Sequence, residues 1–156
     1  MVGKESKEER LMLKFQHKSL IMYNILWTDV ENPRNLIVRG DELKQFIIDS
    51  GFSPAEARIY RVNAQREYQI GISINDVIDI EGMEGIYFQR CLRIQDCLVY
   101  QHAFEGAPIA KSRTFLKQHA KEKNLRPLDG SFYHVMTKSF GYTIVDIYYP
   151  LEKKSL

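Results

Sequence analysis

The sequence lacks the features that mark secreted, membrane-spanning and disulfide-bonded proteins. It has two cysteines in 156 residues, and no apolar run approaches the roughly 20 residues that a membrane-spanning helix needs. Cys91 and Cys97 stand six positions apart in a strand-like segment, which places their Cα atoms roughly 20 Å apart, too far for a disulfide bond. The first ten residues are highly charged, unlike a secretory signal. We therefore expect a cytoplasmic protein with two free thiols and no membrane segment.

Signatures of catalysis, metal binding and nucleic-acid binding are also missing. The net charge is only +2 and the charges are scattered, so nucleic acid is not an expected partner. No G-x-S-x-G, H-E-x-x-H, C-x-x-C or P-loop motif occurs, and the four histidines lack metal-ligand spacing. The sequence thus predicts no metal, no cofactor and no catalytic residue, and favours a protein that is not an enzyme.

The feature that stands out is an internal repeat. Sliding the chain along itself by 73 residues places Leu43-Lys44-Gln45 on Leu116-Lys117-Gln118, Pro54 on Pro127 and Tyr60 on Tyr133. The copies occupy residues 13–76 and 86–149, joined by an acidic, glycine-containing segment at 81–85. We predict a single domain over 12–151, with tails at 1–11 and 152–156.

Each copy has the pattern of a βαββ unit. A long apolar run, 12–30 or 85–104, predicts a first strand that is bent or bulged. A helix follows, capped by Asp41 and ending at Gly51 in the first copy, and ending near Asn124 in the second. A single helical turn at 53–56 and hairpins at 58–75 and 131–149 complete the pattern. The expected fold class is α+β, with pseudo-two-fold symmetry and both helices on one face of a mainly antiparallel sheet.

Alternation along the hairpin strands divides their side chains between two faces. The face expected under the helices is apolar and carries Tyr60, Val62, Tyr68, Ile70, Ile72, Ile74, Tyr133, Val135, Val145, Ile147 and Tyr149. The opposite face carries Arg61, Gln69, Gly71, Ser73, Phe132, His134, Met136, Tyr142, Ile144, Asp146 and Tyr148. Its mixture of small, aromatic and ionisable residues suits either a cleft between the halves or an ordinary half-solvated sheet face.

Four segments of the second copy follow a familiar order: His102-Ala103-Phe104-Glu105-Gly106, Phe115-Leu116-Lys117, Asn124-Leu125-Arg126-Pro127 and Phe132-Tyr133-His134-Val135. The chain closes on Asp146-Ile147-Tyr148-Tyr149-Pro150-Leu151, close to the form Glu-Ile-x-x-Pro-Val. In these features it resembles the GyrI-like, BmrR-type effector-binding domains, as a divergent, stand-alone member. It departs from them with Gly106-Ala107-Pro108 before the helix and with His119 in it. A looser resemblance is to uncharacterised Gram-positive bacterial proteins encoded near secreted LXG-type toxins.

The resemblance implies a site for an amphipathic or cationic organic molecule on the helix-free face. The implied acid is Asp146, the candidate walls are Trp27, Tyr100, Tyr142 and Tyr148, and Arg61 and His134 share the predicted face. Asp146 can alternatively be a solvated strand carboxylate or the partner of Arg61 or His134, the more common role of such a residue. Two other functions stay open: a protein-interaction module, such as an accessory factor for a secreted toxin, and a hydrolase with Asp146 as base and Tyr142 or Tyr148 as orienting donor.

Overall fold

The computed structural model describes residues 15–76, 85–103 and 109–153. The elements in chain order are β1 (Phe15–Val30), the 3-10 turn η1 (Pro33–Asn35), α2 (Leu36–Asp49), β2 (Pro54–Val62), β3 (Tyr68–Ile74), β4 (Ile86–Ala103), α3 (Ile109–Glu122), β5 (Phe132–Ser139) and β6 (Tyr142–Pro150). The predicted tail 1–11, most of the linker at 81–85 and the motif residues 104–108 lie outside the described residues. The α+β class is confirmed, with the strand-helix-strand-strand order expected in each half.

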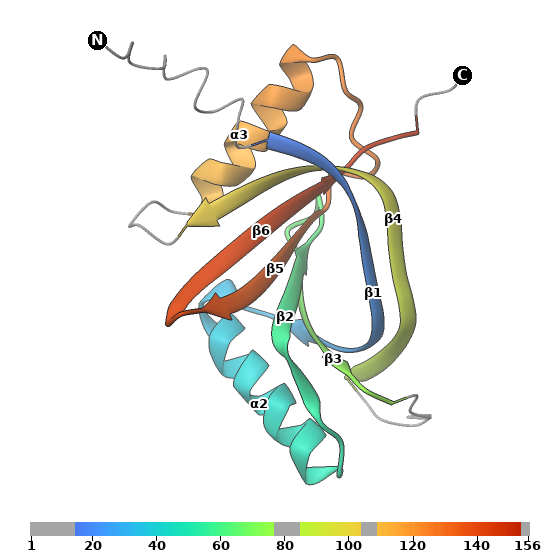
Figure 1. Cartoon of the computed structure of the whole chain (residues 1–156), viewed down its shortest axis with the longest axis vertical. Helices are drawn as coiled ribbons and strands as arrows, with labels where there is room; N and C mark the ends of the chain where they lie inside the picture. Colours follow the sequence, from blue (N-terminus) through green and yellow to red (C-terminus); the bar gives the residue numbers. More distant parts are fainter. Residues whose placement is uncertain (1–14, 77–84, 104–108, 154–156) are drawn as a thin grey trace.

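All six strands belong to one antiparallel sheet that closes on itself as a barrel (Figure 1). The order around the ring is β1-β3-β2-β5-β6-β4, and the ring closes where β4 pairs with β1. Within the first half the order is β1-β3-β2, and within the second it is β4-β6-β5. The two halves therefore share one connectivity, joined by the β2–β5 and β1–β4 pairings.

The long first strands of the two halves bend through irregularities. Between β1 and β4 the register shifts at Lys18 and Leu20, and Asn24 adopts a positive φ of 53°. A bulge of this kind increases twist and lets a strand bend. Strands of 16 and 18 residues can thus curve around one side of the barrel, as Figure 1 shows, and the expected bulge is confirmed.

The start of α2 differs from the prediction. Asn32 Oδ1 accepts a hydrogen bond from the backbone N–H of Arg34, and Pro33 opens η1, so the helical segment begins well before Asp41. Asp41 is an exposed residue inside α2, where its carboxylate accepts a hydrogen bond from Arg58 Nη2 at 2.6 Å. The single helical turn expected at 53–56 is also wrong, because β2 already begins at Pro54 and pairs with Ile74.

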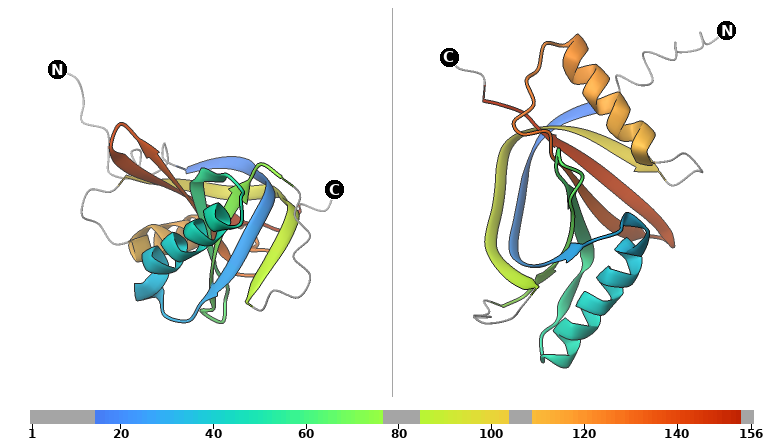
Figure 2. Two further views of the ribbon diagram at one scale, coloured as in Figure 1. Left: turned by 90° about the horizontal axis from the view of Figure 1, so that it is seen from below. Right: turned by 180° about the vertical axis from the view of Figure 1, so that it is seen from behind.

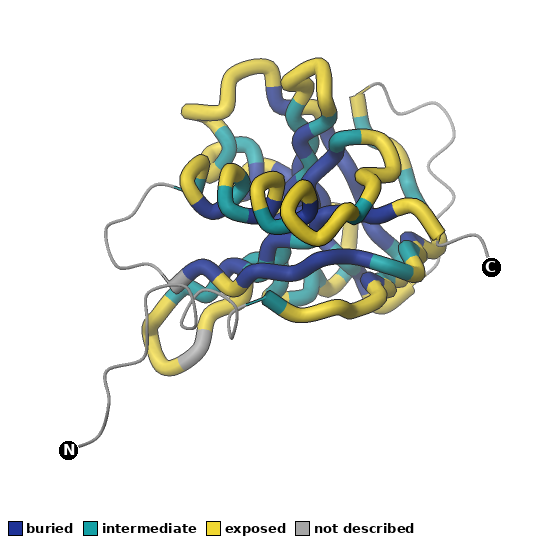
Figure 3. Tube along the Cα trace, turned by 90° about the horizontal axis from the view of Figure 1, so that it is seen from above, coloured by how far each residue is buried: buried dark blue, intermediate teal, exposed yellow. Residues whose placement is uncertain are grey.

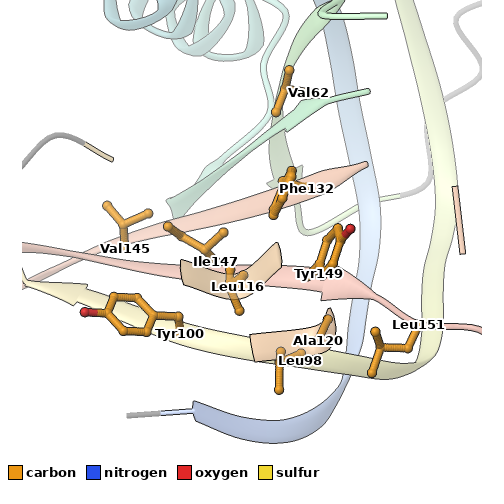
Figure 4. Close-up of a cluster of buried hydrophobic side chains, with 10 residues drawn as sticks. All are labelled: Val62, Leu98, Tyr100, Leu116, Ala120, Phe132, Val145, Ile147, Tyr149 and Leu151. Carbon is orange, nitrogen blue, oxygen red and sulfur yellow. The ribbon is translucent and has the colours of Figure 1, made fainter. Parts of the chain in front are cut away.

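Both helices pack on the outside of the ring of strands (Figures 1 and 2). α2 covers β3 and its neighbours β1 and β2, with Leu43 and Ile47 buried. α3 covers β4 and β6 and buries Leu116 and Ala120 against their outer side chains (Figure 4). In Figure 3 the buried residues follow the strands, while the strand ends and most helix turns are exposed. Neither α2 nor α3 is long and apolar enough to span a bilayer, and they are the only α-helices in the described ranges.

Residues that are 73 positions apart do not always lie on the same face of the sheet. The offset aligns α2 with α3 so that Leu43 and Ile47 correspond to Leu116 and Ala120, which are buried in the same way. It also aligns Tyr60 with Tyr133, but these two side chains belong to core clusters on opposite faces of the sheet. A shift of one residue reverses the face of every side chain in a strand, so the halves correspond in connectivity and not residue by residue in β2 and β5.

Candidate functional site

The face of the strands turned away from both helices forms the inner surface of the barrel, and we call it the inner face. Its apolar part is one cluster of buried side chains packed together: Leu20, Ile25, Trp27, Ile59, Leu92, Cys97, Val99 and Tyr133. Met22, Ile94, Val135 and Tyr148 pack against it while half exposed. The helix-free face therefore carries a second apolar core, with half-buried aromatic and aliphatic groups at its boundary.

Strand register arranges the inner face in two rows that cross all six strands. The first, which we call the Arg61 row, runs Asp29, Gln69, Arg61, Tyr133, Tyr148 and Val99 from β1 to β4. The second, the Trp27 row, lies two residues further along each strand and runs Trp27, Gly71, Ile59, Val135, Asp146 and Gln101. Neighbours in a row are about 4.8 Å apart. Four of the seven predicted site residues, Trp27, Arg61, Asp146 and Tyr148, therefore lie in these two rows.

The facing of β5 corrects the sequence-based division. Tyr133 pairs with Tyr148 and Val135 pairs with Asp146, so Tyr133 and Val135 lie on the inner face. Phe132, His134 and Met136 lie on the helix-covered face instead. The prediction was inverted because five consecutive β5 residues are apolar or aromatic, so alternation carries no information there and only the hairpin register decides the face.

His134 is consequently a core residue and not a ligand-binding one. Its ring is fully buried and stacks on Tyr60, with centroids 3.9 Å apart and planes 6° from parallel. Its Nδ1 lies 3.3 Å from the Tyr60 carbonyl oxygen. Burial, with a smaller effect from Arg113, lowers the pKa of His134 to about 3, so the imidazole is neutral at physiological pH.

Tyr100 lies away from the inner face, and Tyr142 lies at the far end of it. Tyr100 is buried beneath α3, where its ring packs against Phe15 and Phe115 with centroids 5.3 and 6.3 Å away. Tyr142 stands at the β5–β6 hairpin and is 74% exposed. The hairpin expected within 131–149 turns at Phe140 and Gly141, which both have positive φ, the geometry of a tight two-residue turn. Tyr100 therefore cannot be a wall of a site that contains Asp146, and Tyr142 stands four residues from Asp146 along β6, roughly 13 Å away by strand rise.

Gly71, which has no side chain, lets the Trp27 ring lie close against β3. A Cβ atom at position 71 would lie 2.9 Å from Trp27 Cε3 and 2.7 Å from Ile25 Cγ2, so a larger residue cannot be accommodated without movement. The indole Nε1 donates a hydrogen bond to Gln89 Oε1 at 2.9 Å. Trp27 is only 4% exposed and therefore forms the floor of the inner face rather than an open wall.

Asp146 and Tyr148 are half-buried neighbours on β6, toward the β4 end of the two rows. Gln101 Nε2 donates a hydrogen bond to Asp146 Oδ1 at 3.1 Å, so the carboxylate is met by a neutral amide. Within the described ranges it makes no ion pair. Burial raises the pKa of the Tyr148 phenol, and the charge of Asp146 raises it further, which places the two groups close together.

A second acid, Asp29, was missed by the sequence-based analysis. Its Oδ1 accepts hydrogen bonds from Tyr87 Oη and from Gln69 Nε2, both at 3.0 Å, and Gln69 Nε2 also contacts Tyr87 Oη. Burial raises the pKa of Tyr87 to about 12, helped by the hydrogen bond to Asp29. Alternation from Ile25 through Trp27 to Asp29 could have indicated that Asp29 shares the face of Trp27; nothing in the sequence pairs it with Tyr87, 58 positions away.

Arg61 supplies the cation of the inner face. Its Cζ lies 5.9 Å from the centroid of the Tyr133 ring, and its charge lowers the pKa of both Tyr133 and Tyr87, against the larger effect of burial. The guanidinium is therefore close to two phenols. Tyr133 itself is buried, and burial raises its pKa.

The inner face contains neither a reactive thiol nor, within the described residues, a cluster of metal ligands. Cys97 is fully buried, and burial raises the pKa of its thiol to about 12, so it is not a thiolate nucleophile. No group of three metal-ligating side chains occurs among residues 15–76, 85–103 and 109–153. Of the donors expected for a hydrolase, only Tyr148 adjoins Asp146, because Tyr142 lies at the hairpin.

Several solved structures have a similar fold at low sequence identity. The chain aligns with EcmrR in its DNA complex at a TM-score of 0.70 and 17% identity, over 94% of this chain and 60% of that one. It aligns with the EcmrR C-terminal domain at 0.62 and 15% identity, over 89% and 98% of the two chains. A hydrolase from Listeria innocua aligns at 0.55 and 12% identity, over 94% and 97%. The chain spans 60% of the full EcmrR chain and nearly all of its C-terminal domain. No family profile and no curated protein matches the sequence.

Proposed function

We propose that this chain is a GyrI-like binding module whose inner face takes an amphipathic or cationic organic molecule beside Asp146 and Tyr148. The observation that carries the proposal is the state of Asp146: a half-buried carboxylate next to a phenol ring, hydrogen-bonded by a neutral amide and without a cation in ion-pair contact within the described ranges. The fold shared with the EcmrR C-terminal domain supports it.

The surroundings of Asp146 and Tyr148 favour the binding of an organic cation. Removing a carboxylate from water is costly unless an opposite charge accompanies it, and a bound cation would provide that charge. The Tyr148 ring would add a cation–π attraction of about 0.5–2 kcal/mol. Half-buried Ile144, Val135 and Tyr148 around Asp146 would contact the apolar part of the same ligand.

A pair of aryl-phosphorus probes that differ in charge tests this proposal. Tetraphenylphosphonium is an aromatic cation, and triphenylphosphine oxide is a neutral compound of similar shape. We expect the cation to bind the 156-residue chain and to raise the Tm of the protein as the concentration of the cation exceeds Kd. Asp146→Asn should weaken the cation about 5- to 10-fold and leave the neutral compound unchanged, whereas Tyr148→Ala should weaken both.

Asp49→Asn is the matched control. Asp49 is an exposed carboxylate on α2, outside the barrel, and it also accepts a hydrogen bond from a glutamine amide, Gln45 Nε2 at 2.8 Å. Its replacement removes the same charge without touching the inner face and should leave binding unchanged. If tetraphenylphosphonium does not bind below millimolar concentration, or if Asp146→Asn binds it as well as the parent does, the proposal is wrong and the protein-interaction alternative takes its place.

A further inference from the structure

Arg61 is a half-buried charge on the inner face for which the described residues provide no counter-ion. The ion pairs of the described ranges are His17–Asp96, Arg39–Glu42 and Arg58–Asp41, and none involves Arg61. Its neighbours in the Arg61 row are Gln69 on one side and Tyr133 on the other, both neutral. A guanidinium withdrawn from water in this way is strongly stabilised by any anion that reaches it.

Neither nearby acid neutralises Arg61. Asp29 lies two strands away in the same row, about 10 Å by strand spacing, and its Oδ1 is already occupied by Tyr87 and Gln69. Asp146 lies two strands away on the other side and in the next row, roughly 12 Å by the same spacing, and is engaged by Gln101. Arg61 is hydrogen-bonded to the neutral Tyr133 phenol, so within the described residues the inner face presents a cation without a counter-ion and, across β5, a carboxylate without a cation.

We propose that the ligand of the inner face is zwitterionic: its cationic group lies at Asp146 and its anionic group, a carboxylate, sulfonate or phosphate, lies at Arg61. This inference rests on the proposed function and adds the second charge. A guanidinium presents two parallel N–H donors that match two oxygens of such an anion. The side chains of Arg61 on β2 and Asp146 on β6 cover part of the distance between these strands. A ligand whose positive and negative groups are a few bonds apart would cover the remaining distance, lying over Tyr133 and Tyr148.

The neighbouring arginine on β2 shows why Arg61 is the one available for a ligand. Arg58 points to the helix-covered side, where Asp41 Oδ1 accepts a hydrogen bond from its Nη2 at 2.6 Å and its Nη1 lies against Gly40. Arg58 is therefore satisfied within the protein. Arg61 lies on the opposite face, over an aromatic ring and next to the Tyr87 phenol.

Two probes that differ only in the anion test the inference. A benzyldimethylammonio-propanesulfonate zwitterion carries an aromatic cation and a sulfonate, and benzyldimethylpropylammonium lacks only the sulfonate. We expect calorimetry on the 156-residue chain to show the zwitterion binding about tenfold more tightly, the gain typical of a charge-assisted hydrogen-bonded pair. Arg61→Gln should bring the ratio of the two affinities to about one, and Asp146→Asn should weaken both probes by the same factor.

Two further variants keep the test falsifiable. Arg58→Gln removes a positive charge from the same strand on the other face and should leave the ratio near ten. Arg61→Lys keeps the charge but loses the paired donors, and should retain an intermediate ratio. If the cation binds the parent as tightly as the zwitterion, or if Arg61→Gln preserves the ratio while remaining folded, the anion site is refuted and the cation site stands. If neither probe binds the parent, the proposed function and this inference fail together.

Discussion

Replacing Gly71 with alanine tests whether the inner face is packed as described, because this position sets how closely Trp27 approaches β3. The added Cβ would lie 2.7 Å from Ile25 Cγ2 and 2.9 Å from Trp27 Cε3, against 3.4 Å or more for ordinary contact. Both side chains would have to move by about half an ångström into a cluster where Ile25 and Ile59 are completely buried. Overpacking of this size costs about 1–3 kcal/mol.

The expected loss can be measured as a fall in thermal stability. For a domain of this size 1 kcal/mol corresponds to about 2–4 °C in Tm, so Gly71→Ala should melt roughly 2–12 °C below the parent. Trp27 is the sole tryptophan of the chain, so its emission reports directly on movement of the indole. We expect a changed emission maximum in the folded variant.

A double-mutant cycle isolates the contact responsible. Trp27→Leu removes the indole that Cβ would strike, so Gly71→Ala should cost less in that background than in the parent, with a coupling energy of about 0.5–3 kcal/mol. A Gly71→Ala variant with the parent Tm and emission, or one whose cost is the same in both backgrounds, would refute the close approach of Trp27 to β3.

Two more outcomes follow from buried titratable groups. Because burial lowers the pKa of His134 from 6.5 to about 3, the unfolded chain binds more protons than the folded one between these values, and stability should fall by about 1.4 kcal/mol per pH unit as pH drops below 6.5. Urea unfolding at pH 7 and pH 5 should show a smaller decrease for His134→Phe than for the parent, and equal decreases would contradict the assignment. Cys91 is exposed and Cys97 is buried with its pKa raised to about 12, so a thiol reagent at pH 8 should modify one thiol in the native protein and two after denaturation. Rapid modification of both native thiols would show that the inner core is open.

The general fold could be predicted because it depends on local signals. Apolar runs, the Leu43 and Ile47 stripe and the Phe140-Gly141 turn each appear within a few residues of sequence, and each predicts an element that the structure contains. Closure of the sheet could not be predicted, since it requires β1 to pair with β4 between residues such as Phe15 and Tyr100, 85 positions apart. No short segment encodes that pairing.

The candidate site was predicted in part for the same reason. Alternation along β2 and β6 placed Arg61, Asp146 and Tyr148 on one face, in agreement with the strand register, whereas Trp27 entered only through the family resemblance. In β5 both faces are apolar or aromatic, so the facing of His134 depended on the β5–β6 register. The hydrogen bonds of Asp29 with Tyr87 and Gln69 join three strands and follow from the tertiary structure alone.

The ring order of the strands has a consequence for how the chain can be divided. Each half contributes three adjacent strands, and both seams between halves, β2 with β5 and β1 with β4, are made of backbone hydrogen bonds between distant segments. A fragment containing only the first half would carry two unsatisfied strand edges of a shape that the second half completes. Separately expressed halves, 15–76 and 85–153, would thus be complementary fragments, and either one alone would present the edges through which strands exchange and aggregate.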